Sequence, residues 1–392
     1  MISVAEATQR VVAVFAPVAS QTVPVGEAFA RVLAEPVEAR MTQPPAPMSS
    51  MDGYAVRAAD VPGTLKLAGS APAGHPFAGS LGAGQTVRIF TGGVVPDGAD
   101  AIVIQEDTEA QGARIVMKVA AKPGKHIRPA GMDFRQGDLL APPGRRLTAR
   151  DLSLIAAGDV AEVRVRRKPV VVVAATGDEL SLPGQPRSAG GIVASSGFAL
   201  KAMIESWGGG VRDLGVLPDR IEAIQGIADA AQGADLVVTL GGASVGDHDL
   251  IQNALGPRGF ELDFWKIAMR PGKPLIFGRL GGVPLIGLPG NPVSALVCAT
   301  LFVQPAISAL LGTETRIATR AAKLAQPLGP NDSRQDYLRC ETTTRDGELW
   351  VRAFDVQDSS MLSGLAKADA LIVRPPHATA IPAGARVEVI PL

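Results

Sequence analysis

The stretch from residue 169 to 312 constrains the fold most, because apolar runs of strand length alternate there with amphipathic helical segments. The runs "PVVVVAATG" (169–177) and "ADLVVTLGG" (234–242) are continuously apolar, and the helical pattern "PDRIEAIQGIADAAQG" (218–233) lies between them. Strands that are apolar on both faces and alternate with helices are typical of a mostly parallel sheet that is covered on both sides. The other elements expected in this stretch are a helix at 195–210, strands at 211–217, 274–280 and 283–288, and a long helix from Pro292.

Short β-type runs dominate the segments on either side. Between about residues 36 and 133, prolines and glycines separate runs such as "TVRIFTGG" (86–93) and "AIVIQEDT" (101–108), which predicts a β-rich domain with irregular loops. The tail after residue 312 returns to short strands. It contains "RDGE" (345–348), which has the Asp-Gly signal of a hairpin turn.

The expected fold class is therefore α/β plus β in several domains. Helical spacing over residues 3–18, and a second helix between the cap Thr148 and Gly158, indicate a helical linking element. The predicted domains are a helical linking domain (1–25 and 134–168), a β-rich domain (26–133), a central α/β domain (169–312) and a C-terminal small β-barrel (313–392).

Composition argues against several classes of function. Acidic and basic residues balance at 38 each. This balance argues against a large nucleic-acid-binding surface, because such a surface needs a stripe of basic residues. The two cysteines, Cys298 and Cys340, are expected to be buried free thiols, and the four histidines lack the spacing of a zinc site. The apolar run at 294–311 contains Gln304 and Pro305 and is expected to be a buried helix, not a membrane span. The N-terminus has no apolar h-region, so we expect a cytoplasmic protein.

Three glycine-rich stretches follow predicted strands: "TGDEL" (176–180), "GGASVGDHD" (241–249) and "LPGNP" (288–292). In a parallel sheet they would meet at the carboxyl edge, where ligands bind in open α/β folds. Asn291 is expected to cap the helix that Pro292 begins, and Gly290 would let an oxyanion approach the free backbone N–H groups. A plain strand-to-helix turn is the alternative for "LPGNP" taken alone, and "GGASVGD" alone is a weak signal.

Charged residues surround these stretches. The acids in or beside them are Asp178, Glu179, Asp235, Asp247 and Asp249. Carboxylates beside a phosphate site repel the ligand unless a cation such as Mg²⁺ lies between them. Lys266, Arg270 and Lys273 bring three cations into the same region and could bind an oxyanion. Ordinary surface solvation is the alternative for both sets.

The β-rich region has turns of its own that could carry chemistry. "MDGYAV" (51–56) places an acid just ahead of a strand, and "TGG" (91–93) offers a hydroxyl and bare backbone. "HIRPAGMDF" (126–134) adds Arg128 and Asp133. From the residues alone, an ordinary turn without a function is the alternative for each of them.

Taken in order, "MDGYAVR", "TGGVVPDGAD", "IRPAGMD", "TGDEL", "GGASVGDHD", "FWKIAMRPGKP" and "GLPGNPVSA" strongly resemble the molybdopterin molybdenumtransferases. This MoeA-like family includes the E domain of gephyrin, and the resemblance spans almost the whole chain. It implies insertion of molybdenum from molybdate into adenylylated molybdopterin with release of AMP, in a Mg²⁺-dependent step. It also implies a homodimer whose cleft lies between the sheet domain of one subunit and the β-rich domain of the other. Transient contacts with the molybdopterin adenylyltransferase and with cofactor-receiving enzymes are expected, without nucleic acid or membrane.

The resemblance also implies site residues. The expected catalytic residues are Asp52, Thr91, Asp133, Glu179, Asp235 and Asp249, with Glu179 and Asp249 as metal ligands. The expected substrate-binding residues are Arg128, Gly241, Gly242, Ser244, Gly246, Lys266, Arg270, Lys273, Pro289, Gly290, Asn291 and Pro292. Arg270 replaces a lysine of some relatives, which keeps the charge and changes the donor geometry. Leu240 replaces a small polar residue, which removes a possible donor. In the C-terminal domain, Ser360 and Ser363 are only possibilities.

Three other functions stay open at this point. The first is adenylylation of molybdopterin by MgATP, and the β-rich flanks argue against it. The second is a non-catalytic cofactor carrier or scaffold, and the retained acids argue against a pure scaffold. The third is an unrelated nucleotide-binding α/β protein.

Overall fold

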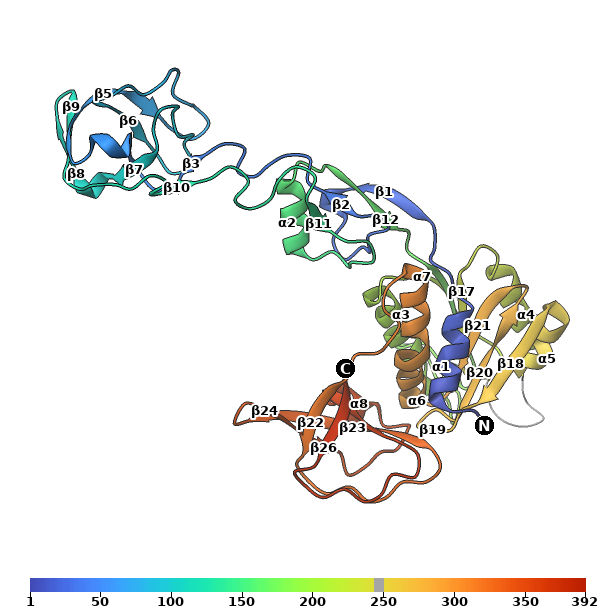
Figure 1. Cartoon of the computed structure of the whole chain (residues 1–392). Coiled ribbons are helices and arrows are strands. Elements are labelled where there is room, and N and C mark those ends of the chain that lie inside the picture. The colour runs from blue at the N-terminus through green and yellow to red at the C-terminus, as the bar shows by residue number, and fades with distance from the viewer. Residues whose placement is uncertain (243–249) are drawn as a thin grey trace. The chain divides into compact units, whose positions relative to one another are not determined.

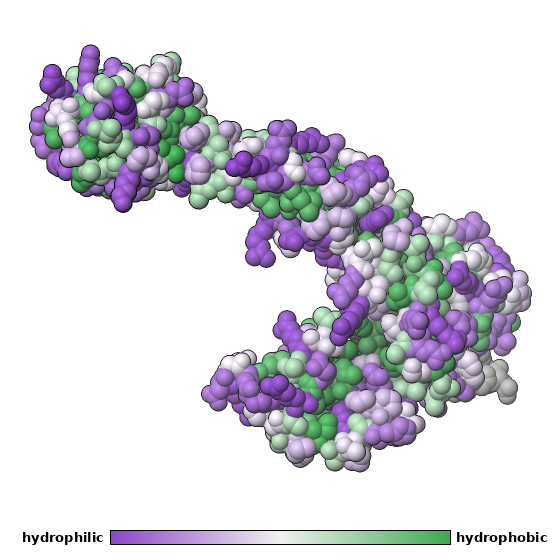
Figure 2. Space-filling view, in the orientation of Figure 1, coloured by the Kyte–Doolittle hydropathy of each residue, from purple (hydrophilic) through white to green (hydrophobic). Residues whose placement is uncertain are grey.

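The computed structural model describes residues 1–242 and 250–392, and its contacts divide the chain into two compact units (Figure 1). Unit 1 consists of Met1–Gln21 and Arg166–Leu392, and unit 2 of Thr22–Val165. The finer division into four domains stays a prediction. On the face shown in Figure 2, polar and apolar residues are interspersed over both units.

Unit 1 contains a six-stranded sheet in the order β16-β13-β17-β21-β20-β18. Its strands are β13 (Val170–Thr176), β16 (Gly210–Leu217), β17 (Leu236–Leu240), β18 (Phe260–Lys266), β20 (Pro274–Leu280) and β21 (Val283–Leu288). The first four strands in this order are mutually parallel, and β20 and β18 are antiparallel to their neighbours. Strand β17 is buried along its whole length. The predicted mostly parallel sheet is confirmed.

Helices cover both faces of this sheet (Figure 1). The helices α4 (Ile221–Ala230) and α5 (Leu250–Leu255) pack through Ile224 and Ile251 against Val172 and Val237 of the sheet. The helices on the other side are α1 (Val4–Ala13), α3 (Ser196–Ser206), α6 (Pro292–Cys298) and α7 (Gln304–Leu311). Two-sided burial explains why the strands are continuously apolar.

The expected long helix runs from Pro292 to Leu311 as α6, a π-helical segment (Ala299–Val303) and α7. Its length and composition would allow it to cross a membrane, and it alone among the described residues passes that test. However, 83% of its apolar window is buried inside the fold, which is typical of a core helix. Its Cys298 and the barrel residue Cys340 are buried free thiols, as expected.

The C-terminal part of unit 1 is a closed five-stranded barrel, because β23 pairs with both β24 and β25. Its strands are β22 (Arg320–Leu324), β23 (Gln335–Arg345), β24 (Glu348–Ala353), β25 (Ala370–Arg374) and β26 (Arg386–Pro391). Asp346 and Gly347 have φ angles of 50° and 77° at the tip of the β23–β24 hairpin, so the predicted Asp-Gly turn is confirmed. Smaller elements of unit 1 are β14 (Leu180–Ser181), β15 (Ile192–Val193), β19 (Met269–Arg270) and α8 (Leu362–Ala366).

Unit 2 is built around a second six-stranded sheet in the order β7-β4-β6-β5-β9-β8. Its strands are β4 (Gly53–Val56), β5 (Gly63–Ala71), β6 (Gln85–Ile89), β7 (Ala101–Ile104), β8 (Thr108–Gln111) and β9 (Arg114–Met117). The other strands and the α-helix here are β1 (Ser20–Pro24), β2 (Val37–Glu38), β3 (Met48–Ser49), β10 (Ile127–Arg128), β11 (Leu139–Ala141), α2 (Ala149–Ala157) and β12 (Glu162–Arg166). Strands β1 and β12 cross the boundary between the two units. Thr148 caps α2 in a capping box with Asp151, and α2 ends at Gly158, as the sequence predicts.

Candidate active site

A cavity of about 1050 Å³ lies at the carboxyl edge of the unit 1 sheet. The parallel strands β13, β17 and β21 end at Thr176, Leu240 and Leu288, so the chain segments that follow them open onto the same edge. All three glycine-rich stretches supply lining residues. Those expected from the sequence are Glu179, Gly241, Gly242, Pro289, Gly290, Asn291 and Pro292. Ser244, Gly246 and Asp249 lie outside the described residues.

The described lining of the cavity is negatively charged. Glu179 and Asp219 are its charged members, and none of the described lining residues is basic. The backbone N–H of Asp219 donates to Asp178 Oδ1 at 3.1 Å. Burial and the neighbouring charges of Asp178 and Glu179 raise the pKa of Asp219 above the ordinary aspartate value. A phosphorylated ligand would therefore meet a negative edge unless a cation stood between them.

Asp219 was not recognised from the sequence. The pattern "PDRIEAIQGIADAAQG" (218–233) predicts only a helix, yet β16 is parallel to β13 and ends at Leu217. Its carboxyl end therefore lies at the same edge as that of β13, and Asp219 follows β16 closely, as Glu179 follows β13. An acid just after a strand of a parallel sheet was the signal that could have revealed this residue.

Asn291 makes a different contact from the one expected. It occupies the N-cap position of α6 ahead of Pro292, but its side chain makes no capping hydrogen bond. Instead, Asn291 Nδ2 donates to Ser359 Oγ at 3.1 Å, and the Val293 N–H donates to the Ser359 carbonyl oxygen at 3.1 Å. The start of the helix thus binds a barrel loop, and at least one of its N–H groups is already used.

Arg339 fixes that barrel loop through hydrogen bonds to its backbone. Its side chain is only 1% exposed. It donates to the carbonyl oxygens of Asp358 at 2.9 Å and Met361 at 3.0 Å. Asp358 Oδ1 in turn accepts from the N–H of Ser360 at 2.8 Å and from its hydroxyl at 2.5 Å. The loop so fixed places Ser360 in the cavity lining, while Ser363 is not part of the lining.

The three expected cations of "FWKIAMRPGKP" do not line the cavity in the described part of the chain. Arg270 donates to both carboxylate oxygens of Asp336, at 3.0 and 2.6 Å, because β19 pairs with β23 of the barrel. Lys266 Nζ lies 3.7 Å from the centroid of the Trp265 ring. Arg270 thus has an ion-pair partner within unit 1, and roles for Lys266, Arg270 and Lys273 in binding an oxyanion stay predictions.

Asp235 is not brought to the carboxyl edge. It precedes Leu236, the first residue of β17, and therefore lies at the opposite end of that strand from Gly241. Its carboxylate accepts two hydrogen bonds from Arg167, at 2.6 and 2.7 Å, and one from the Val170 N–H at 2.7 Å. The side chain is 14% exposed. This arrangement joins the starts of two neighbouring strands.

Unit 2 brings two of the expected residues together. Asp52 Oδ1 accepts from the Thr91 N–H at 2.7 Å and from its hydroxyl at 2.8 Å. These bonds hold the pKa of Asp52 below the ordinary aspartate value. Arg128 lies in β10, which pairs with β3, and the Asp133 N–H donates to the Gln43 carbonyl oxygen. Arg128 and Asp133 are both exposed.

Replacing Thr91 with valine should raise the pKa of Asp52 toward the ordinary value. The bond from the Thr91 N–H remains, so the pKa should stay below that value. Because folding lowers this pKa, Asp52 stabilises the fold above its unfolded pKa, and that contribution disappears as pH falls through the folded pKa. Carboxyl carbon NMR titration measures the change. Thr91→Ser keeps the hydroxyl and should not shift the pKa; equal pKa values in the valine variant and the wild type would contradict the assignment.

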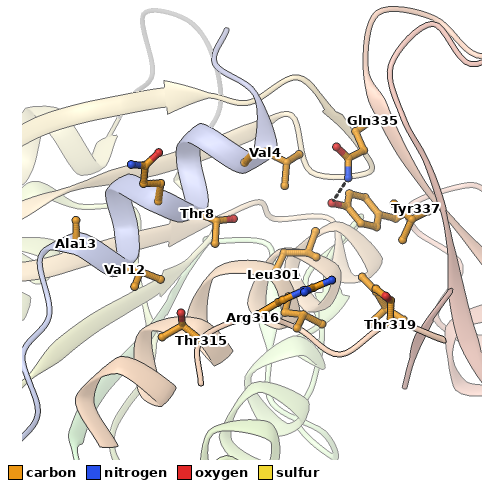
Figure 3. A pocket seen from close by; sticks show the side chains of 15 residues that line it. Val4, Thr8, Val12, Ala13, Leu301, Thr315, Arg316, Thr319, Gln335 and Tyr337 are labelled. Atoms are coloured by element: carbon orange, nitrogen blue, oxygen red, sulfur yellow. Dashed lines mark hydrogen bonds between the residues drawn. The ribbon is translucent and has the colours of Figure 1, made fainter. Parts of the chain in front are cut away.

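A second cavity of about 640 Å³ lies between α1 and the barrel (Figure 3). Val4, Thr8 and Val12 of α1 line one side, and Gln335 and Tyr337 of β23 line another. Gln335 Nε2 donates to the Tyr337 hydroxyl oxygen at 2.8 Å. Its described lining is largely apolar and contains no acid. The first cavity, with its carboxylates and glycine-rich stretches, is therefore the better candidate for chemistry on a phosphorylated ligand.

Comparison with known protein families covers nearly the whole chain. Residues 2–158 match the MoeA N-terminal region (domain I and II), residues 172–309 the probable molybdopterin binding domain, and residues 321–392 the MoeA C-terminal region (domain IV). Two solved structures of the molybdopterin biosynthesis MoeA protein from Pyrococcus horikoshii superpose with TM-scores of 0.85, at 31% and 25% identity. They match 100% of this chain and 99% and 100% of theirs.

Several relatives carry the name molybdopterin molybdenumtransferase, among them proteins of Haemophilus influenzae and Bacillus subtilis. The protein of Haemophilus influenzae is 37% identical over 377 residues, which are 93% of this chain and 92% of the relative. The protein of Bacillus subtilis is 31% identical over 403 residues, covering 99% and 94%. The chain therefore belongs to the molybdopterin molybdenumtransferase family.

Proposed function

We propose that this protein is an enzyme that inserts molybdenum from molybdate into adenylylated molybdopterin and releases AMP. The single observation that carries the proposal is the cavity at the carboxyl edge of the sheet, in a chain of this family. It combines glycine-rich stretches, which admit a ligand close to the backbone, with the carboxylates of Glu179 and Asp219, which could bind a cation that bridges phosphate groups. Adenylylated molybdopterin is a phosphoanhydride and fits that chemistry.

The donor set of the cavity fits Mg²⁺. Glu179 and Asp219 offer carboxylate oxygens, the ligand type that Mg²⁺ prefers. Among the described residues no cluster of three or more metal-binding side chains is preformed. Mg²⁺ does not need one, because it commonly uses one or two carboxylates together with substrate phosphates and waters. Glu179 and Asp219 would hold the ion, and a bound Mg²⁺ would neutralise charge on the phosphoanhydride. The role of Asp249 as a second ligand stays a prediction.

The chain's own residues would act by positioning the ligand. Gly241 and Gly290 leave the backbone open to the ligand, and the segments at the starts of α3 and α6 face it. Ser360, fixed by the loop that Arg339 holds, would close the barrel side. Water would cleave the phosphoanhydride, giving AMP and the pterin phosphate. In the coupled step two molybdenum–sulfur bonds form, one oxygen of molybdate leaves as water with the two thiol protons, and molybdenum keeps its oxidation state. Most of the rate enhancement would come from orientation and charge neutralisation.

The experiment that tests this function measures AMP release from adenylylated molybdopterin with Mg²⁺, with and without molybdate. Release that depends on molybdate is expected. ATP consumption in the absence of molybdate would instead indicate molybdopterin adenylylation, and tight binding without release would indicate a carrier.

A homodimer is part of the proposal, with the unit 2 residues Asp52 and Thr91 of one copy serving the cavity of the other. Its support is the family resemblance, which assigns Asp52 and Thr91 to the site, together with the hydrogen-bonded pair that these two residues form in unit 2. Cytoplasmic location also belongs to the proposal, because two buried free cysteines suit a reducing compartment. Transient contacts with the adenylylating enzyme and with enzymes that receive the cofactor complete it.

Mixing two inactive variants should restore activity if the site is shared between copies. In a heterodimer of Glu179→Gln and Asp52→Asn chains, one site carries both changes and the other carries neither. Random assembly makes half of the dimers mixed, so about a quarter of wild-type activity per chain is expected. The measurement is molybdate-dependent AMP release after co-expression. Activity no higher than that of the separate variants would contradict a shared site, and a chain that sediments as a monomer would contradict the dimer.

A further inference from the structure

Thr176 carries a hydroxyl that the fold leaves without a hydrogen bond. It is the last residue of β13 and is only 4% exposed, yet its Oγ1 has no partner among the described residues. The preceding residues of the strand are Val170 to Val173, Ala174 and Ala175, so an apolar side chain would suit the position. Leaving a buried hydroxyl unpaired costs about 1–3 kcal/mol. A group that binds this hydroxyl from outside the fold would offset that cost.

The surroundings of Thr176 connect the hydroxyl to the cavity. Thr176 is a lining residue, together with Gly241 and Gly242. A Cβ atom at Gly241 or at Gly242 would lie 3.3 Å from Thr176 Oγ1, and both glycines have positive φ angles, of 88° and 67°. Side chains at these two positions would therefore crowd the buried hydroxyl, and glycines avoid that contact.

Thr239 shows that an orphan hydroxyl alone is not a binding site. It lies in β17, is fully buried, and its Oγ1 also lacks a partner among the described residues. It is paired in register with Ala174 of β13 and Gly287 of β21, inside the sheet, and it does not line the cavity. Position separates the two threonines: Thr176 lies at the carboxyl end, where ligands bind, and Thr239 does not.

We propose that the Thr176 hydroxyl donates a hydrogen bond to a phosphoryl oxygen of the ligand in this cavity. The inference rests on the proposed function, in which that ligand is adenylylated molybdopterin, and it adds a binding residue for the phosphate groups. A hydroxyl is a suitable donor here because the charged groups of the described lining are carboxylates, which accept hydrogen bonds and repel phosphate. The phosphoryl oxygen belongs either to the adenylyl half or to the pterin half.

The test compares Thr176→Val with the matched control Thr239→Val and with Thr176→Ser, which keeps the hydroxyl. Calorimetry measures the binding of AMP, molybdopterin and adenosine to the full-length protein with Mg²⁺ under anaerobic conditions. Thr176→Val should weaken binding of AMP or of molybdopterin by roughly 10- to 100-fold, as expected for one hydrogen bond to a charged acceptor. Adenosine, which has no phosphate, should bind as to the wild type. The probe whose affinity falls identifies the phosphate that Thr176 binds.

Thr176→Ser and Thr239→Val should bind all three probes with affinities close to those of the wild type. The unfolding temperature of Thr176→Val should be no lower than that of the wild type, because the unpaired hydroxyl is gone. Unchanged affinity of Thr176→Val for both phosphorylated probes would overturn the inference. An equal loss in both valine variants would overturn it too, because that would indicate a packing effect. The inference would also be overturned if the wild-type protein bound neither AMP nor molybdopterin. Molybdate-dependent AMP release by the wild type is measured in parallel, so failure of the proposed function is distinguished from failure of the inference.

Discussion

Replacing Glu179 with glutamine is expected to lower molybdate-dependent AMP release at least about 100-fold while leaving the fold intact. Glu179 is exposed in the loop after β13, and its carboxylate lines the cavity beside Asp219. Glutamine keeps the size of the side chain but removes the negative charge that would hold a cation at the phosphoanhydride. The loss should therefore appear in turnover, not in thermal unfolding.

Glu205→Gln is the matched control for this variant. Glu205 is also exposed and lies in α3, and it does not line the cavity. It should turn over like the wild type. Normal AMP release by the Glu179 variant would remove the basis for placing a metal at this carboxylate, whereas a large drop in unfolding temperature would indicate a structural role for Glu179.

Replacing Asp235 with asparagine should destabilise unit 1 by about 2–3 kcal/mol and leave the turnover of the folded enzyme unchanged. The family resemblance predicts a catalytic role for Asp235, but its carboxylate is paired with Arg167 and with the Val170 N–H at the end of the sheet away from the cavity. Removing its charge leaves Arg167 without its counter-ion. Urea unfolding followed by tryptophan fluorescence measures the effect, because Trp207, Trp265 and Trp350 all lie in unit 1.

Asp229→Asn provides the comparison for a surface ion pair. Asp229 pairs with Arg258, but its side chain is 64% exposed, and exposed pairs contribute only about 0–1 kcal/mol. This variant should unfold within about 0.5 kcal/mol of the wild type. If the Asp235 variant unfolds normally but loses AMP release, the catalytic role is correct and the structural one is wrong.

Much of the fold can be predicted from the sequence because its signals are local. Continuous apolar runs such as 169–177 give buried parallel strands, Asp346-Gly347 gives a hairpin turn, and Thr148 gives a helix cap. The edge where the glycine-rich stretches meet follows from strand direction alone. The strands, the turn and the cap depend on residues within a few positions of one another, and the shared edge adds only the rule that strands of a parallel sheet run in one direction.

The contacts of individual site residues could not be predicted in the same way. Arg167 and Asp235 are 68 positions apart, and so are Asn291 and Ser359. No pattern within a strand or helix specifies such partners, because tertiary packing selects them. Asp219 was missed for a related reason, since its position at the cavity depends on β16 lying parallel beside β13. The unpaired hydroxyl of Thr176 is likewise visible only in the folded sheet.

The most direct test of the proposed activity is the ratio of molybdenum bound to the pterin per AMP released, measured with wild-type protein, Mg²⁺ and molybdate in single-turnover conditions. The proposal predicts one molybdenum atom for each AMP, with no AMP release when molybdate is omitted. AMP release that proceeds without molybdate, or that leaves the pterin free of molybdenum, would contradict the coupling of phosphoanhydride cleavage to metal insertion.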